Sequence, residues 1–164
     1  MFFPAHAALA LLPFALAIGI WVAWSDMKFM RIPNQSVLAL LAVFVLLGPV
    51  LFPFKTYLWQ LSHFAALLVF GFVLNMARAI GAGDAKFVAA MGPFLATQDM
   101  PLIVILTSSI LLAAFATHRG LRLVPAVRRA TGDWESWARR DFPMGFALAG
   151  ILIFYLLLAT ILGQ

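Results

Sequence analysis

Long apolar runs separated by short polar connections dominate the sequence. A helix that crosses a bilayer needs about 20 apolar residues, and six segments approach or reach that length. They cover residues 5–24, 36–54, 57–77, 84–97, 101–117 and 142–162. The fourth segment is short and is interrupted by Gly92-Pro93. The pattern predicts an all-α, polytopic integral membrane bundle of about six helices, which forms a single domain over residues 1–164.

The composition agrees with a membrane protein. Hydrophobic residues make up 65% of the chain and charged residues 10%, and the mean hydropathy is +1.04. A soluble domain of this size cannot bury so much apolar surface, so the bilayer is the expected solvent. The apolar segments also lack the alternating polarity that is typical of membrane β-barrels.

Several kinds of chemistry are disfavoured by the residues present. The chain has no cysteine, which excludes disulfides, thiolate metal ligands and cysteine nucleophiles. Its three histidines, His6, His63 and His118, lie in three different segments, without the close spacing of a metal motif. We therefore expect neither a metal site nor a cofactor.

The basic residues indicate how the chain is oriented. The net charge is +5, and every Lys and Arg except Lys55 lies in the first, third or fifth connection between predicted helices. Positively charged connections stay on the cytoplasmic side, so these three connections are expected there and both termini outside. Membrane topology and lipid headgroups explain the charge, and no nucleic-acid partner is expected.

Two acids are the strongest candidates for chemistry. The chain has only six Asp and Glu residues, and an ionisable group at a membrane boundary needs a partner or a function. Asp26 follows the first apolar segment and precedes Ile32-Pro33-Asn34, where proline favours a rigid turn. A purely structural alternative is that Asp26 pairs with Lys28 or Arg31 at the headgroups.

The second acid lies in Gly81-Ala82-Gly83-Asp84-Ala85-Lys86. Glycines let another backbone, such as an extended peptide, approach closely. Asp84 is expected at the start of the fourth helix, where exposed N–H groups favour negative charge. The structural alternative is a helix-capping aspartate that pairs with Lys86.

The predicted topology brings both acids to the cytoplasmic edge. Two carboxylates about 4 Å apart repel by roughly 4 kcal/mol at an effective dielectric of 20. This is near three pKa units, which is enough to hold one proton on the pair near neutral pH. The ionised acid then draws a proton from water while the neutral acid donates to a scissile carbonyl oxygen. The two acids therefore suggest a hydrolytic site.

These motifs resemble those of the type IV prepilin peptidases, which are aspartic proteases of the membrane. The resemblance rests on Asp26 with Ile32-Pro33-Asn34, on the Gly81–Lys86 stretch, and on Phe142-Pro143-Met144-Gly145 at the start of the last apolar segment. It covers nearly the whole chain. Met144 and Phe146 differ from the residues usual near the last motif.

The resemblance implies a role for each matching residue. Asp26 and Asp84 would be the catalytic pair, and Gly81 and Gly83 would shape the active-site turn. The residues expected to bind substrate or shape the site are Gly81, Gly83, Lys86, Pro33, Asn34, Pro143 and Gly145. The implied reaction removes the short basic leader of a prepilin at the cytoplasmic face of the bacterial inner membrane.

One difference from larger members of the family narrows the expected activity to peptide cleavage. Those members carry a cytoplasmic insertion with paired cysteines and often N-methylate the product, whereas this chain has no cysteine and a short first connection. It resembles the short, peptidase-only form associated with tight-adherence (Flp-type) pili, so methyltransferase activity is not expected.

Two other functions fit the same residues. In a small proton- or cation-coupled transporter or channel subunit, Asp26 and Asp84 would carry ions. In a pilus-assembly scaffold they would have no catalytic role.

Two expectations concern other parts of the chain. The basic connection over residues 118–141 is typical of a helix at the membrane interface. His63 and Asn75 are expected to form hydrogen bonds between helices.

Overall fold

The computed structural model describes all residues, 1–164, and contains helices but no strands. The helices are α1 (Ala5–Phe29), α2 (Asn34–Leu51), α3 (Phe54–Met76), α4 (Ala82–Met91), α5 (Met100–Arg122), α6 (Pro125–Ala130) and α7 (Met144–Leu162). Three short 3₁₀ helices are interspersed: η1 (Gly92–Phe94), η2 (Thr97–Asp99) and η3 (Glu135–Trp137). The predicted all-α fold is confirmed.

Five of the helices are long and apolar enough to cross a membrane. They are α1, α2, α3, α5 with the preceding η2, and α7. The predicted segment over residues 84–97 differs, because its α-helix ends at Met91 and continues as η1. A ten-residue helix is only about 15 Å long, which is shorter than the apolar core of a bilayer. The bundle is that of a multi-pass membrane protein.

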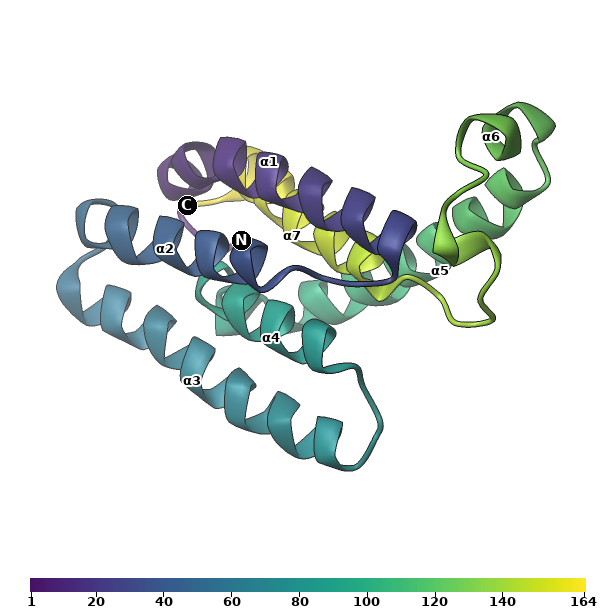
Figure 1. Cartoon of the computed structure of the whole chain (residues 1–164). Helices are drawn as coiled ribbons and strands as arrows, with labels where there is room; N and C mark the ends of the chain where they lie inside the picture. Colours follow the sequence, from purple (N-terminus) through teal and green to yellow (C-terminus); the bar gives the residue numbers. More distant parts are fainter.

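The short segment nevertheless carries the chain from one end of the bundle to the other. Figure 1 shows α4 starting at the end where α3 stops and running back toward the end that holds both termini. There Asp99 accepts hydrogen bonds from the backbone N–H groups of Phe2, at 3.0 Å, and Phe3, at 3.3 Å. The first, third and fifth connections therefore lie together at the opposite end, as the basic residues predicted.

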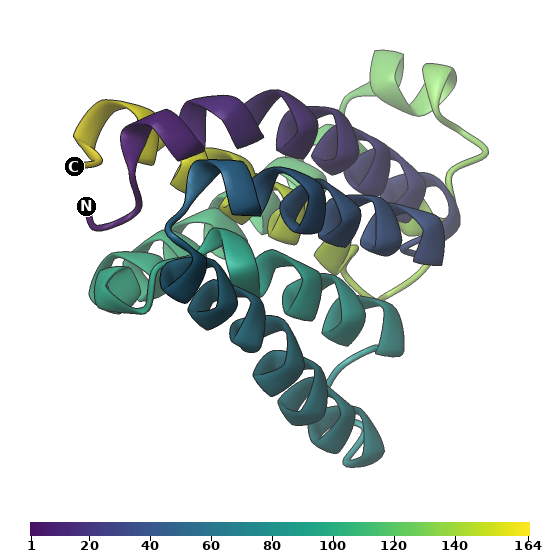
Figure 2. The ribbon, with the colours of Figure 1, turned by 90° about the vertical axis from the view of Figure 1, so that its left-hand side faces the viewer.

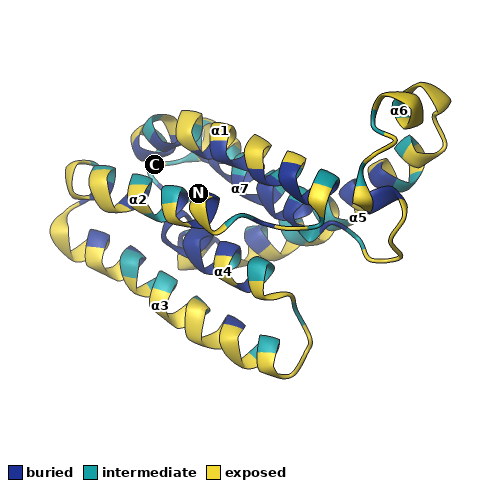
Figure 3. Ribbon diagram, viewed as in Figure 1, coloured by how far each residue is buried: buried dark blue, intermediate teal, exposed yellow.

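The centre of the bundle is the pair α1 and α7, which pack closely along their length (Figure 2). Small residues face this contact, among them Ala8, Ala15 and Ala149, which are buried. Small side chains let two membrane helices approach closely. Exposed apolar residues cover the outside of the bundle, most densely on α3 (Figure 3), as expected for a surface in contact with lipid.

The basic connection between α5 and α7 differs from the interfacial helix expected for it. Only α6 is an α-helix here, and it has six residues. Trp137 is not displayed to the membrane interface but is buried and stacked on His118, with ring centroids 4.9 Å apart. Its indole N–H donates to the carbonyl of Thr131 at 2.9 Å. These contacts fold the connection back onto the end of α5.

Candidate active site

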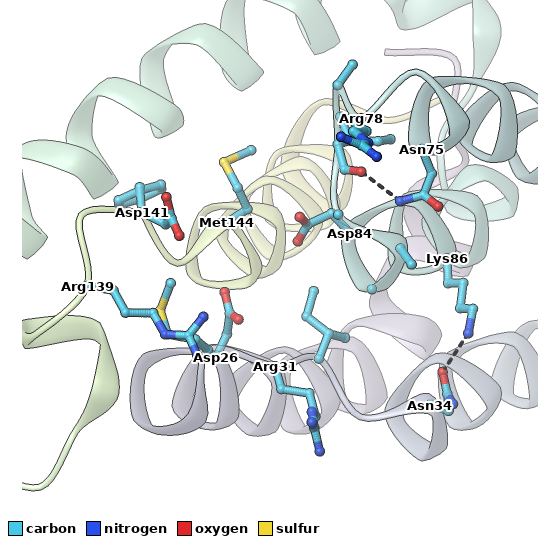
Figure 4. A pocket seen from close by; sticks show the side chains of 18 residues that line it. Asp26, Arg31, Asn34, Asn75, Arg78, Asp84, Lys86, Arg139, Asp141 and Met144 are labelled. Atoms are coloured by element: carbon cyan, nitrogen blue, oxygen red, sulfur yellow. Dashed lines mark hydrogen bonds between the residues drawn. The ribbon is translucent and has the colours of Figure 1, made fainter.

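A cavity of about 970 Å³ opens at the end of the bundle where α1, α3 and α4 meet the start of α7. Figure 4 shows the side chains that line it. Asp26 and Asp84 are both among them, so the two acids that the sequence singled out share one cavity although they are 58 positions apart in the chain. The cavity forms where the first, third and fifth connections converge.

Asp26 lies in the last turn of α1, which continues to Phe29 beyond the predicted end at residue 24. The helix ends at Met30, whose left-handed backbone (φ 49°) lets its N–H donate to the Asp26 carbonyl at 2.9 Å. The side chain is 5% exposed. Its Oδ2 accepts a hydrogen bond of 2.7 Å from the backbone N–H of Gly145. The first turn of α7 therefore fixes the Asp26 carboxylate.

Asp84 lies in the first turn of α4, three residues after the N-terminal cap at Gly81. Its carboxylate points into the cavity (Figure 4). Burial raises the pKa of Asp84 above its ordinary value, and the nearby Gly81 amide only partly opposes this effect. Burial disfavours the charged form of a carboxyl group, so this site favours a proton on Asp84.

Neither acid is neutralised by the basic residues considered in the structural alternatives. Lys28 forms an ion pair with Asp133 at 3.2 Å. Lys86 donates to the side-chain oxygen of Asn34 at 3.1 Å rather than pairing with Asp84. The two ion pairs in the molecule, Lys28–Asp133 and Arg139–Glu135, include neither cavity aspartate. Because no cation holds them, both carboxylates remain available for chemistry.

The remaining site residues expected from the sequence have different positions. Gly81, Gly83, Asn34 and Lys86 line the cavity. Pro33 and Pro143 do not line it but cap the N-terminal ends of α2 and α7, respectively. Gly145 does not line the cavity either, but its backbone N–H donates a hydrogen bond to the cavity residue Asp26.

Two glycines of the site have no room for a side chain. A Cβ on Gly145 would lie 3.0 Å from Cβ and Oδ2 of Asp26 and from Cγ1 of Ile32. A Cβ on Gly81 would lie 2.7 Å from Oδ2 of Asp84. Each aspartate is therefore packed against a glycine backbone.

The cavity also contains residues to which the sequence assigned no individual part in a site. They are Arg31, Arg78, Asp141, Phe142 and Met144. Asn75 lines it too, and its side chain donates to the carbonyl of Ile80 at 2.9 Å. That bond closes the turn after α3 and does not join two helices as predicted. No periodicity signals these residues, because they lie in connections or in the terminal turns of helices, whose path depends on the fold.

The side chains of the molecule gather no group of three or more His, Asp or Glu residues placed to hold a metal ion. The cavity itself is lined by carboxylates, side-chain amides and cations, and carboxyl groups are able to transfer protons.

Comparison with known protein families assigns the chain to one of them. The family model described as "Type IV leader peptidase family" matches residues 13–117, which include both Asp26 and Asp84. The chain belongs to that family. The match spans α1 to α5 and leaves out α6 and α7. No curated protein and no solved structure matched the chain. Membership supports a peptidase of the prepilin leader type, in which the described cavity is the candidate active site.

Proposed function

We propose that this single-domain leader peptidase is a membrane aspartic endopeptidase that removes the N-terminal leader of Flp-type prepilins. Asp26 and Asp84 are its catalytic pair, and the cavity opens to the cytoplasm from the bacterial inner membrane. The observation that carries the proposal is that both carboxylates face one cavity without a cationic partner. The basic residues at the same end support the cytoplasmic orientation.

The proposed reaction needs only the two carboxyl groups and a water molecule. The ionised carboxylate takes a proton from water as the water oxygen bonds to the scissile carbonyl carbon. The neutral carboxyl group donates its proton to the carbonyl oxygen, which gives a tetrahedral diol. When the diol collapses, the C–N bond breaks and the leaving nitrogen receives the proton of the pair. The ionised carboxylate takes a proton from one diol hydroxyl group as the carbonyl group re-forms. One proton remains shared by the acids, so the enzyme returns to its starting state.

Burial raises the pKa of Asp84, which favours retention of a proton in the cavity. Because two neighbouring carboxyl groups titrate as a unit, the proton is assigned to the pair and not to either acid.

The test is to co-express the protein with an Flp-type prepilin and to measure the mass of the pilin. We expect wild type to give one shortened product without an added methyl group. Asp26→Asn and Asp84→Asn should each lower the rate of cleavage by about 10²- to 10⁴-fold, the usual contribution of a general acid or base. Full activity in either variant would exclude the two-aspartate mechanism.

Asp133→Asn is the matched control. Asp133 lies at the same end of the bundle, its side chain is 65% exposed, and it pairs with Lys28 outside the cavity. We expect this variant to insert and to cleave as wild type does. Loss of cleavage in all three variants would indicate a general effect of removing an acid from this end of the molecule.

A further inference from the structure

Two residues other than glycine have a left-handed backbone in the whole chain, and both line the active-site cavity. They are Met30, with φ 49°, and Arg78, with φ 58°. This backbone region is unfavourable for residues with a Cβ. Residues held in unfavourable backbone conformations cluster at functional sites. Met30 ends the helix that carries Asp26, which accounts for its position. Arg78 follows the end of α3, and a long cationic side chain there occupies the left-handed position.

The turn that holds Arg78 is a helix-ending motif in which glycine is usual. The N–H of Arg78 donates to the carbonyl of Asn75 at 2.9 Å, and the N–H of Ala79 donates to the carbonyl of Leu74 at 2.9 Å. This pair of bonds defines the Schellman motif, with Arg78 at the left-handed position that glycine most often occupies. The side-chain amide of Asn75 also stabilises the turn, because it donates a hydrogen bond to the carbonyl of Ile80.

The side chain of Arg78 has no partner within the protein. Its guanidinium forms no ion pair, although it lies on the wall of the cavity that carries Asp84 (Figure 4). Lys86 and Arg139 also line the cavity but are engaged, since Lys86 donates to Asn34 and Arg139 pairs with Glu135. Arg31, the remaining cation of the cavity, has no side-chain partner either, but its backbone is not left-handed. The chain thus keeps an exposed arginine with a strained backbone on the wall of the cavity.

We propose that Arg78 is a substrate-binding residue that donates hydrogen bonds to main-chain carbonyl oxygens of the peptide beside the scissile bond. The inference rests on the proposed peptidase function. An extended peptide that enters the cavity brings carbonyl groups that lose water and need donors. Gly81 and Gly83 provide no side chain next to Asp84, so a peptide backbone can approach that wall. The guanidinium supplies several donors in a fixed planar fork.

The test measures cleavage kinetics and thermal stability of Arg78→Gly and Arg78→Lys in purified, detergent-solubilised full-length protein, with a prepilin peptide as substrate. Arg78→Gly should raise the KM about tenfold or more, as expected when a charge-assisted hydrogen bond to substrate is lost, and leave kcat within about twofold. The same variant should melt at the wild-type temperature or higher, because glycine relieves the backbone strain. Arg78→Lys should recover part of the lost affinity.

Arg129→Gln is the matched control for removal of one positive charge, because Arg129 lies on α6 outside the cavity. Its KM should equal that of wild type. The increase in KM for Arg78→Gly should be the same for peptides with different side chains around the cut site, since main-chain carbonyl groups are common to all of them.

Three results would overturn the assignment. The first is an unchanged KM in Arg78→Gly. The second is a loss restricted to peptides with an acidic side chain, which would indicate side-chain recognition. The third is a shifted pH profile of kcat, which would indicate that Arg78 acts through Asp84. The proposed function is tested separately, because Asp26→Asn and Asp84→Asn should be inactive whatever Arg78 does. Absence of cleavage by wild type would remove both proposals.

Discussion

Gly145→Ala is the sharpest test of how the fold positions the candidate catalytic pair. Gly145 lies in the first turn of α7 and donates its N–H to Oδ2 of Asp26 at 2.7 Å. An added methyl group would lie 3.0 Å from two atoms of Asp26 and from one atom of Ile32. Since these atoms belong to α1 and to the turn before α2, no single side-chain rotation relieves all three contacts.

The size of the effect follows from these distances. Relief of contacts at 3.0 Å requires a shift of a few tenths of an ångström, and overpacking of this kind costs about 1–3 kcal/mol. The Asp26 carboxylate moves away from Gly145, so the 2.7 Å bond lengthens and the acid leaves its position relative to Asp84. A misplacement of 1 Å can cost about 10²-fold in rate. We therefore expect kcat for leader cleavage to fall by about 10- to 100-fold.

The assay is the initial rate of cleavage of a purified prepilin, followed by mass. Gly150→Ala is the control, because Gly150 lies in the same helix and its added methyl group would meet only Cγ2 of Ile110 at 3.1 Å. This variant should lose some stability but retain its kcat. If Gly145→Ala cleaved at the wild-type rate while Asp26→Asn were inactive, positioning of Asp26 by α7 would be refuted.

Three further predictions concern separate parts of the molecule. Because burial raises the pKa of Asp84, kcat should persist above the pH at which an ordinary aspartate loses its proton and should fall as pH rises through the raised pKa; a pH profile of kcat measures this. Tyr155→Phe removes bonds to Asp99, at 2.8 Å, and from the Ala96 N–H, at 3.0 Å; it should cost about 1–3 kcal/mol, seen as a lower melting temperature with unchanged kcat. Trp137→Ala removes the stack on His118 and should make residues 125–142 more sensitive to limited proteolysis, with no change if the stack does not hold this connection.

The sequence predicted the arrangement of the helices because two strong signals agree. Apolar length located the helices, and the positions of Lys and Arg placed alternate connections at one end. Together they predicted that Asp26 and Asp84 lie at the same end of the bundle, and the structure has both in one cavity. Helix ends were predicted less well: α1 continues five residues further than expected, because polar residues at its end, including the cavity residue Asp26, remain helical.

Contacts between distant segments could not be predicted from local patterns. The bond from Gly145 to Asp26 joins residues 119 positions apart, and only the packing of α7 on α1 creates it. Asp99 accepts hydrogen bonds from Tyr155 and from the N-terminal backbone, both distant in the sequence. The structural alternative for Asp84 paired it with Lys86, two residues later, yet on a helix such neighbours face different directions. The Lys86 side chain reaches Asn34 instead.

The short fourth segment explains how polar backbone is accommodated inside this bundle. Irregular backbone within a membrane protein is tolerated only where it is buried in protein or lines a water-filled cavity. Both ends of α4 meet this condition: residues 78–81 line the active-site cavity, and Gly92, Pro93 and Phe94 are buried. Neighbouring helices α2, α3 and α7 contact α4, which removes the need for α4 to reach across the bilayer. A short helix can therefore begin at Ala82 and present Asp84, in its first turn, to the cavity, whereas a full-length span facing lipid has no place for the glycine turn at its start.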